Sequence, residues 1–325
     1  MGADIEQAEA EDEQLLGSAA CRSEPAPRRP SAAQRLGHLL LGQLLALLVC
    51  CTGIFSKRLA EAGVVAPTAQ SFTNYLLLAI VWRAVLVVRP AQSSPQAAPS
   101  ADAPRRWRLR TALVVLADVE ANYIVVKAFS LTSFTSVQLL VGPSSLPLAM
   151  LLSMRVLGRR YSVAHGVAVA ACIGGLALLV VSDAAGAEGV PDAAPSPLLG
   201  DLLCLASGAL YAASNVGQEA ILRSGVSSRE WLSRLGSWGA LLSALQIALL
   251  ERSELARLWG SIAQGTLEVG PGWVAAQAAG FGLALFLFYS LAPRLLASRG
   301  AVFFNLSLLT ADFWAVAIGG ALLSL

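Results

Sequence analysis

Charged residues are scarce in this sequence. Asp, Glu, Lys and Arg make up only 14% of the 325 residues, whereas 56% are hydrophobic and the mean hydropathy is +0.64. A soluble domain carries about 25% charged residues, because water must solvate its surface. The shortage therefore excludes an ordinary soluble protein and indicates that lipid surrounds most of the chain. The net charge of +2 says little by itself, and no nucleic-acid partner is expected.

Signatures of catalysis are missing as well. The chain has only two histidines, His38 and His165, and its five cysteines show no CxxC spacing. This excludes a disulfide framework and gives no support to a zinc site or a Ser-His-Asp triad. There is no Walker A loop and no dinucleotide fingerprint. We therefore expect no enzyme, no metal and no cofactor. A membrane-embedded enzyme acting on lipid is a weak rival, because it would normally cluster His, Cys or carboxylates.

Nine apolar segments of near-spanning length are present instead. A helix rises 1.5 Å per residue, so about 20 apolar residues cross a hydrocarbon core of about 30 Å. The segments fall at residues 36–56, 66–88, 111–131, 135–154, 163–182, 198–222, 231–250, 272–291 and 301–322. We predict an all-α polytopic membrane protein with nine transmembrane helices.

The basic residues set the predicted orientation. If the N-terminus is cytosolic, most of the 23 Lys and Arg residues fall on the cytosolic side. Positive charge is enriched on that side of membrane proteins. Residues 1–35 are polar, acidic at first and then rich in Arg and Pro, and cannot bury a core. We predict that they form a disordered cytosolic tail.

Two short stretches recur along the chain. LLGQLLAL at Leu40–Leu47 returns as LLGDLLCL at Leu198–Leu205, and SFTSVQL at Ser133–Leu139 falls opposite SRGAVFFNL at Ser298–Leu306. If the sixth segment repeats the first, the repeat unit contains five helices. A unit with an odd number of helices inserts its two copies in opposite orientations, as in many secondary transporters.

These repeats predict a plan of two inverted five-helix halves. The fifth helix of the second half would follow the last residue given, so we expect a nine-helix version of a ten-helix plan, with the tenth helix missing. The predicted parts are a tail at 1–35, a first repeat at 36–182, a non-cytosolic loop at 183–197 and a truncated second repeat at 198–325.

The third segment carries ionisable residues at membrane depth. Asp118, Glu120 and Asn122 lie about 10–17 Å in from Thr111, near the middle of a hydrocarbon core. At 100° per residue, Asp118 and Asn122 share one helix face, and Glu120 lies about 200° round from Asp118. Such residues are costly in lipid, so other helices must enclose them or they must line a wet cavity. A transport pathway is therefore indicated; contacts that only join helices are the plainer alternative.

Two prolines interrupt the fourth segment. Pro143 and Pro147 lie four residues apart, behind Gln138, and each removes an intrahelical hydrogen bond. We predict a kink or break near the middle of this helix, which would offer free backbone groups to a solute. The equally favoured alternative is that the prolines only shape the packing.

Five short motifs lie in the apolar segments: LADVEANY at Leu116–Tyr123, TSVQLL at Thr135–Leu140, LGD at Leu199–Asp201, YAASNV at Tyr211–Val216 and NLSLLTAD at Asn305–Asp312. Together they resemble the F subgroup of solute carrier family 35, within the drug/metabolite transporter superfamily. The resemblance runs from about residue 41 to the end of the chain. It implies ten-helix carriers built from two inverted halves. It also implies a nucleobase-like solute, although relatives outside the F subgroup exchange nucleotide sugars.

The chain departs from this family pattern in places. The family usually has Asp-Cys where Val141-Gly142 stands, and a pair of acids where Gln218-Glu219 stands. Asn215, Gln218 and Glu219 approach the cytosolic end of the sixth segment, where solvated positions are at least as expected as a site. These departures and the missing helix keep a truncated, non-transporting protein as an alternative.

The predicted solute site combines acids, amides and one ring. Asp118 and Glu120 would couple protons or hold a polar or cationic group, and Asp312 lies deep in the ninth segment. Neutral hydrogen bonds would come from the amide side chains, and Tyr123 would stack on the solute. The candidate substrate-binding residues are Asp118, Glu120, Asn122, Tyr123, Gln138, Asn305 and Asp312.

The predicted function is secondary-active transport by alternating access. Deep acids outnumber deep bases, so a small neutral or cationic organic solute, such as a nucleobase or nucleoside, fits better than a phosphate-bearing one. A nucleotide-sugar transporter of the endomembrane system is the alternative. The expected location is the plasma membrane or a Golgi or endosomal membrane, and a homodimer is left open.

Overall fold

The computed structural model describes residues 31–90, 105–186, 196–266 and 269–319. Residues 1–38 and 39–325 form separate units, and of the first unit only residues 31–38 are described. The predicted tail at 1–35 and the predicted loop at 183–197 thus lie mostly outside the described residues. All regular elements in the described ranges are helical, as expected for the all-α class.

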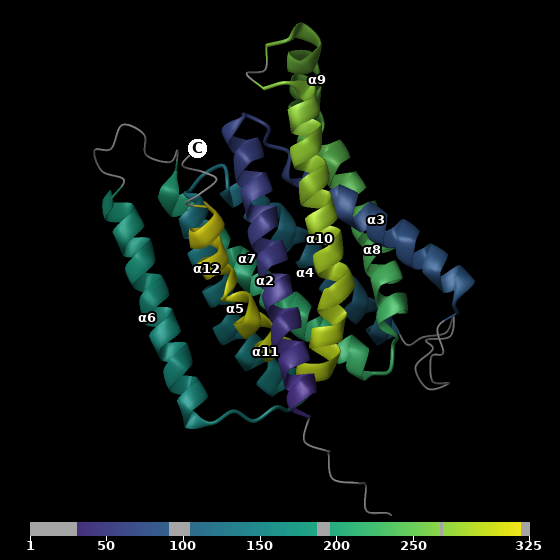
Figure 1. Cartoon of the computed structure of the whole chain (residues 1–325), viewed down its shortest axis with the longest axis vertical. Coiled ribbons are helices and arrows are strands. Elements are labelled where there is room, and N and C mark those ends of the chain that lie inside the picture. The colour runs from purple at the N-terminus through teal and green to yellow at the C-terminus, as the bar shows by residue number, and fades with distance from the viewer. Residues whose placement is uncertain (1–30, 91–104, 187–195, 267–268, 320–325) are drawn as a thin grey trace, which may run out of the picture. The chain divides into compact units, whose positions relative to one another are not determined.

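The helices follow one another along the chain in Figure 1. Two short π-helical turns, η1 at Ile247–Glu251 and η2 at Ala315–Gly319, accompany them. The α-helices are α2 (Ala32–Glu61), α3 (Pro67–Val88), α4 (Arg105–Ala128), α5 (Phe134–Leu157), α6 (Val163–Gly186), α7 (Pro197–Arg223), α8 (Ser228–Gln246), α9 (Arg252–Gln264), α10 (Pro271–Arg299), α11 (Ala301–Leu308) and α12 (Ala311–Trp314).

Local sequence explains where several helices begin. Proline occupies the first position of α3, α7 and α10, where its missing N–H would have no intrahelical partner. The Ser133 hydroxyl caps α5 by accepting a hydrogen bond from the Ser136 N–H, and Ser227 caps α8 in the same way. Gly158 ends α5 with a φ of +64°, a conformation that glycine adopts without strain.

Each of the nine predicted segments coincides with helix, which supports a polytopic membrane protein. Among the described residues, five helices are long and apolar enough to cross a membrane: α2, α3, α5, α7 and α10. The number of nine spans and the inverted repeat stay predictions. The first helix begins at Ala32, four residues before the predicted start, and α6 continues to Gly186 within the predicted loop.

The fourth segment is not broken, because α5 runs continuously with Pro143 and Pro147 inside it, and the alternative of a kink there stays a prediction. The carbonyl of Pro143, which Pro147 deprives of its helical partner, accepts a hydrogen bond from Cys172 Sγ at 3.4 Å. The last segment is interrupted instead, between α11 and α12. There the Ser307 and Thr310 hydroxyls donate to the carbonyls of Phe303 and Ser307, which competes with regular helix.

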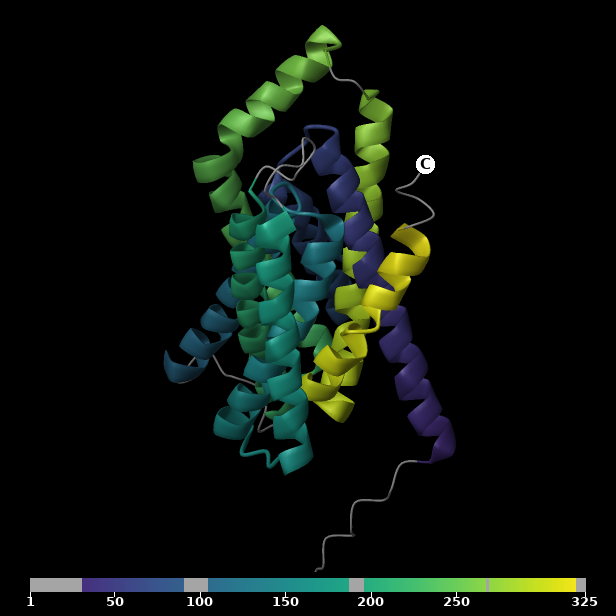
Figure 2. The same ribbon diagram turned by 90° about the vertical axis from the view of Figure 1, so that its left-hand side faces the viewer.

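A short helix, α9, follows α8 and was not predicted. The chain bends as it passes from α8 through η1 into α9 (Figure 2). Within η1, the buried Glu251 carboxylate accepts hydrogen bonds from the backbone N–H groups of Thr68 at 2.7 Å and Ala69 at 3.1 Å. The first N–H groups of a helix lack intrahelical partners and favour negative charge. Glu251 therefore caps α3 from a distant part of the chain.

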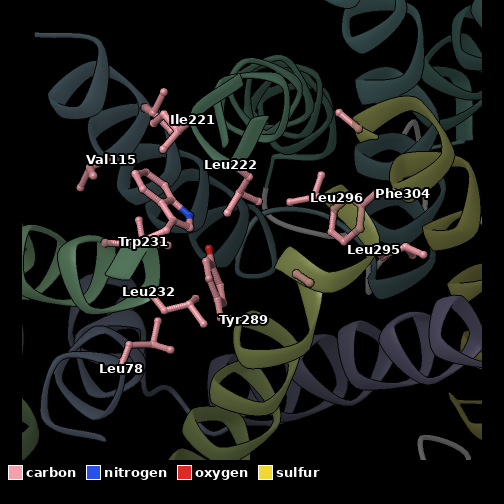
Figure 3. Packing of buried hydrophobic residues seen from close by; sticks show 14 of the residues in the cluster. Leu78, Val115, Ile221, Leu222, Trp231, Leu232, Tyr289, Leu295, Leu296 and Phe304 are labelled. Carbon is pink, nitrogen blue, oxygen red and sulfur yellow. The ribbon is translucent and has the colours of Figure 1, made fainter. Parts of the chain in front are cut away.

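The main hydrophobic core joins α2, α3, α4, α5, α7, α8, α10 and α11. Trp231 and Leu232 of α8 lie beside Leu78 of α3, while Leu296 and Phe304 lie at the other end of the cluster (Figure 3). Glycine permits the close approach of α8 to α3, because a Cβ at Gly236 would lie 2.4 Å from the Ala79 nitrogen. Small residues allow such backbone contact between membrane helices.

We expect Gly236→Ala to destabilise the protein by about 1–3 kcal/mol, because the new methyl group meets backbone atoms that cannot move aside. The measurement is the thermal midpoint of the detergent-solubilised protein. Gly174→Ala in α6 is the matched control, since nothing lies within 4 Å of its Cβ position. Equal midpoints for the two variants would contradict this account of the α3–α8 contact.

Candidate functional site

A cavity lies among α2, α4, α5, α7, α10, α11 and α12. Its volume is about 120 Å³, which is room for several water molecules. Most of its wall is apolar, with aromatic rings from Phe281, Phe288 and Phe304. Polar side chains reach the wall at a few points, which is the usual arrangement of a small-molecule site.

Asp118 of α4 is the polar centre of this wall. Its side chain is only 2% exposed, and its carboxylate accepts three hydrogen bonds from hydroxyl groups. Tyr75 and Tyr289 donate to Oδ2 at 2.8 and 2.7 Å, and Ser214 donates to Oδ1 at 3.0 Å. These donors come from α3, α10 and α7, so one carboxylate connects four helices.

Asn122, one turn further along α4, completes the network. Its Nδ2 lies 2.9 Å from the Tyr75 hydroxyl and 2.8 Å from the Tyr289 hydroxyl, so it can donate to both. Its Oδ1 accepts a hydrogen bond from the Tyr211 hydroxyl at 3.0 Å. The two tyrosine hydroxyls thus accept from Asn122 while they donate to Asp118. This leaves each hydroxyl satisfied in a buried position.

The carboxylate of Asp118 has no ion pair among the described residues, whose salt bridges all lie elsewhere. Burying an unpaired charge is costly, and hydroxyl donors offset only part of that cost. A proton or a cationic group of a bound molecule would complete the neutralisation. Within the described residues, hydroxyl groups are thus the side-chain donors that face this carboxylate.

Two amide groups on the same wall keep unpartnered nitrogens. Asn305 of α11 is 2% exposed, and its Oδ1 accepts a hydrogen bond from Asn215 Nδ2 at 2.9 Å. The Asn305 Nδ2 and the Gln138 Nε2 are buried without a partner among the described groups. Both residues line the cavity. Unsatisfied buried donors favour a ligand that brings hydrogen-bond acceptors.

Five of the seven predicted site residues line the cavity: Asp118, Asn122, Gln138, Asn305 and Asp312. The structure brings Asp312 of α12 to the wall as a second, partly buried acid. Glu120 and Tyr123 are not on the wall. Glu120 points to α8, where it accepts a hydrogen bond from Gln246 at 2.6 Å. Contact of Glu120 or Tyr123 with a solute stays a prediction.

The solvated positions expected for Asn215, Gln218 and Glu219 are wrong, because all three side chains are buried. Asn215 and Gln218 line the cavity. Gln218 donates to Ser214 and accepts from the Trp231 indole N–H. These hydrogen bonds satisfy the polar groups of Gln218 inside the protein, although its position near the end of the sixth segment had suggested contact with water.

Sequence reasoning missed the tyrosines around Asp118. The chain has only five tyrosines, and three of them, Tyr75, Tyr211 and Tyr289, meet at the Asp118–Asn122 pair. A signal was available, since each lies inside a long apolar segment, where a buried hydroxyl needs a partner. Nothing in the spacing along the chain shows that three different helices bring them together.

Comparison with known proteins gives consistent matches. Residues 32–323 match the family described as Solute carrier family 35 (SLC35F). Solute carrier family 35 member F2 of Mus musculus is 36% identical over 87% of this chain and 71% of the mouse protein. Member F2 of Xenopus tropicalis is 35% identical over 88% of this chain and 70% of its own.

More distant matches extend the likeness. An uncharacterized solute carrier family 35 member of Schizosaccharomyces pombe is 33% identical over 86% of this chain and 51% of the yeast protein. One protein of known crystal structure is 19% identical and superposes with a TM-score of 0.52, covering 87% of this chain and 88% of its own. That structure shares the fold.

We expect Tyr289→Phe to destabilise the protein by about 1–2 kcal/mol, because Asp118 loses a hydroxyl donor and Asn122 loses an acceptor. The thermal midpoint in detergent measures the effect. Tyr161→Phe is the control, because it removes a hydroxyl from a residue outside the network and keeps the ring packed on His165. A Tyr289→Phe midpoint no lower than that of Tyr161→Phe would show that the network adds no stability.

Proposed function

Because this chain belongs to the F subgroup of solute carrier family 35, we propose that it binds a small polar organic solute in the described cavity and moves it by secondary-active, alternating-access transport. Membership of a solute carrier family and the apolar helices support a multi-pass membrane protein, and a transporter is favoured over an enzyme. The finer proposal concerns the solute, the coupling and the residues that carry both.

The observation that carries the proposal is the buried carboxylate of Asp118. It lies on the cavity wall, accepts three hydroxyl hydrogen bonds and has no ion pair among the described residues. An ionisable residue at membrane depth marks a solute or ion pathway more often than a packing contact. We assign Asp118 the role of neutralising a cationic solute group or carrying a coupled proton, and Asp312 a supporting one.

The composition of the wall favours a neutral or cationic solute. Aromatic rings at Phe281, Phe288 and Phe304 suit a flat heterocycle, and the free amide nitrogens of Gln138 and Asn305 suit its acceptor atoms. A nucleobase or nucleoside has these features. The cavity wall of the described residues includes no Lys or Arg. A nucleotide sugar, whose phosphates need convergent cations, is therefore the weaker candidate.

The positions of Gln138 and Asn305 support the proposed inverted repeat. Gln138 lies in the fourth predicted helix, and its expected counterpart in the second half is the region Phe303–Asn305 in the ninth. Both amides line one cavity. We propose two inverted halves at 36–182 and 198–325, with the N-terminus cytosolic and the solute held between the halves.

The proposed transport can be measured in proteoliposomes. The probes are tritiated hypoxanthine, adenine, uracil, adenosine and uridine, with UDP-glucose and GDP-mannose as the nucleotide-sugar arm. Saturable uptake of a nucleobase or nucleoside above that of protein-free vesicles is expected. Uptake of the nucleotide sugars alone would favour the endomembrane alternative, and uptake of none would favour a non-transporting protein.

We expect Asp118→Asn to reduce uptake at least about tenfold and to remove its dependence on a proton gradient, because Asn cannot exchange a proton. Uptake by the unmodified protein should rise when the outer solution is more acidic than the lumen. Initial rates at a series of outer pH values measure both effects. Glu254→Gln, which changes an exposed acid of α9, should leave rate and pH profile unchanged. An unchanged profile in Asp118→Asn would remove Asp118 from the coupling.

A further inference from the structure

Another buried carboxylate adjoins the cavity wall in sequence. Glu219 of α7 is fully buried, next to the wall residue Gln218. Its Oε1 pairs with Arg159 at 2.6 Å and with Arg223 at 3.0 Å. Its Oε2 accepts a hydrogen bond from the backbone N–H of Ala301 at 2.6 Å. The carboxylate therefore joins two arginines to the start of α11.

The junction before α11 fits closely around this carboxylate. Gly300 has a φ of +86°, and a Cβ there would lie 2.5 Å from Arg159 Nη2 and 2.8 Å from Glu219 Oε1. Only glycine combines this conformation with this lack of space. The start of α11 is therefore held at a fixed distance from α7.

A second contact between the same two helices lies one turn further in. Asn215 precedes Glu219 by four residues on α7, and Asn305 follows Ala301 by four residues on α11, so each pair shares a helix face. Asn215 Nδ2 donates to Asn305 Oδ1 at 2.9 Å. Glu219 with Ala301 and Asn215 with Asn305 thus form two successive contacts that define one register of α11 on α7.

Asn305 lines the cavity, and this register determines which end of its amide is left without a partner. Its oxygen is occupied by Asn215, and its Nδ2 is the buried, unpartnered end. Because α11 has only eight residues, Ala301 at its start lies about one turn from Asn305, so a shift of this end of the helix also moves Asn305.

We propose that Glu219 is a positioning residue for solute binding: by holding the N–H of Ala301 it fixes the register in which Asn305 offers its amide N–H₂ to a hydrogen-bond acceptor of the solute. The acceptor is a carbonyl oxygen or a ring nitrogen. This inference rests on the proposed function, because it takes the cavity as the solute site. The arginines hold Glu219 and do not touch the solute.

Two variants of Glu219, one that changes its length and one that changes its charge, distinguish this positioning role from a purely electrostatic one. Glu219→Asp keeps the charge for Arg159 and Arg223 but withdraws the carboxylate from Ala301 by one methylene. Glu219→Gln keeps the length and an acceptor oxygen but loses the charge. We expect Glu219→Asp to raise the KM for tritiated hypoxanthine uptake about tenfold, the scale of one lost hydrogen bond to a substrate group, and Glu219→Gln to change it less than about twofold.

A double-mutant cycle tests whether the effect passes through Asn305. Asn305→Leu alone should raise the KM about tenfold, and the Glu219→Asp, Asn305→Leu double variant should be no worse than Asn305→Leu. Glu254→Gln, at an exposed position of α9, is the control and should leave the KM unchanged. Additive effects, or a larger effect from Glu219→Gln than from Glu219→Asp, would overturn the proposal.

A solute-independent measurement keeps this inference separate from the proposed function. In a variant without its five cysteines, Asn305→Cys should react with a small methanethiosulfonate reagent, and Glu219→Asp should change that rate several-fold. Arg257→Cys, at an exposed position of α9 away from this cavity, should react equally in both backgrounds. If hypoxanthine uptake is absent but Glu219→Asp still changes the labelling rate at position 305, nucleobase transport is rejected and the proposed register of α11 on α7 is supported. An unchanged rate at position 305 would reject the register itself.

Discussion

The structure depends on one buried carboxylate that no cation pairs with in the described part of the chain. Asp118 is held by hydroxyl groups of Tyr75, Ser214 and Tyr289, and thereby ties α4 to α3, α7 and α10 around the cavity. In lipid such a group is tolerated only where protein or water encloses it. The same hydrogen bonds that offset the cost of its burial also hold it on the cavity wall, where we propose that the solute binds.

Around this acid, the cavity combines apolar rings with a few amide donors. Flat aromatic walls contribute affinity without direction, whereas Gln138 and Asn305 can select atoms that accept hydrogen bonds. Specificity of this kind is strong because a buried donor left without a partner is penalised. A carrier must also release its solute, and a small number of hydrogen bonds in a mainly apolar cavity suits repeated binding and release.

Much of the fold and part of the site could be predicted from residue order. Apolar length located the helices, and the 100° spacing in α4 separated Asp118 and Asn122 from Glu120. That spacing gives faces of one helix but not the helix that covers each face, so the three hydroxyl partners, up to 171 residues away, could not be found. The prolines suggested a break in the fourth segment, but α5 is continuous, and the Pro143 carbonyl accepts a hydrogen bond from Cys172 Sγ of α6. Glu219 was expected to be solvated because it lies near the end of α7. Its position alone did not identify its two partners, Arg223 at the end of the same helix and Arg159 between α5 and α6.

The most direct test of this account is a cryo-EM structure of the protein frozen with the nucleobase or nucleoside that its proteoliposomes accumulate. The account predicts solute density within hydrogen-bonding distance of Asp118 on one side and of the Asn305 amide nitrogen on the other, between the rings of the cavity wall. Solute density at another place in the bundle, with this cavity unchanged and the Asp118 hydroxyl network intact, would contradict it.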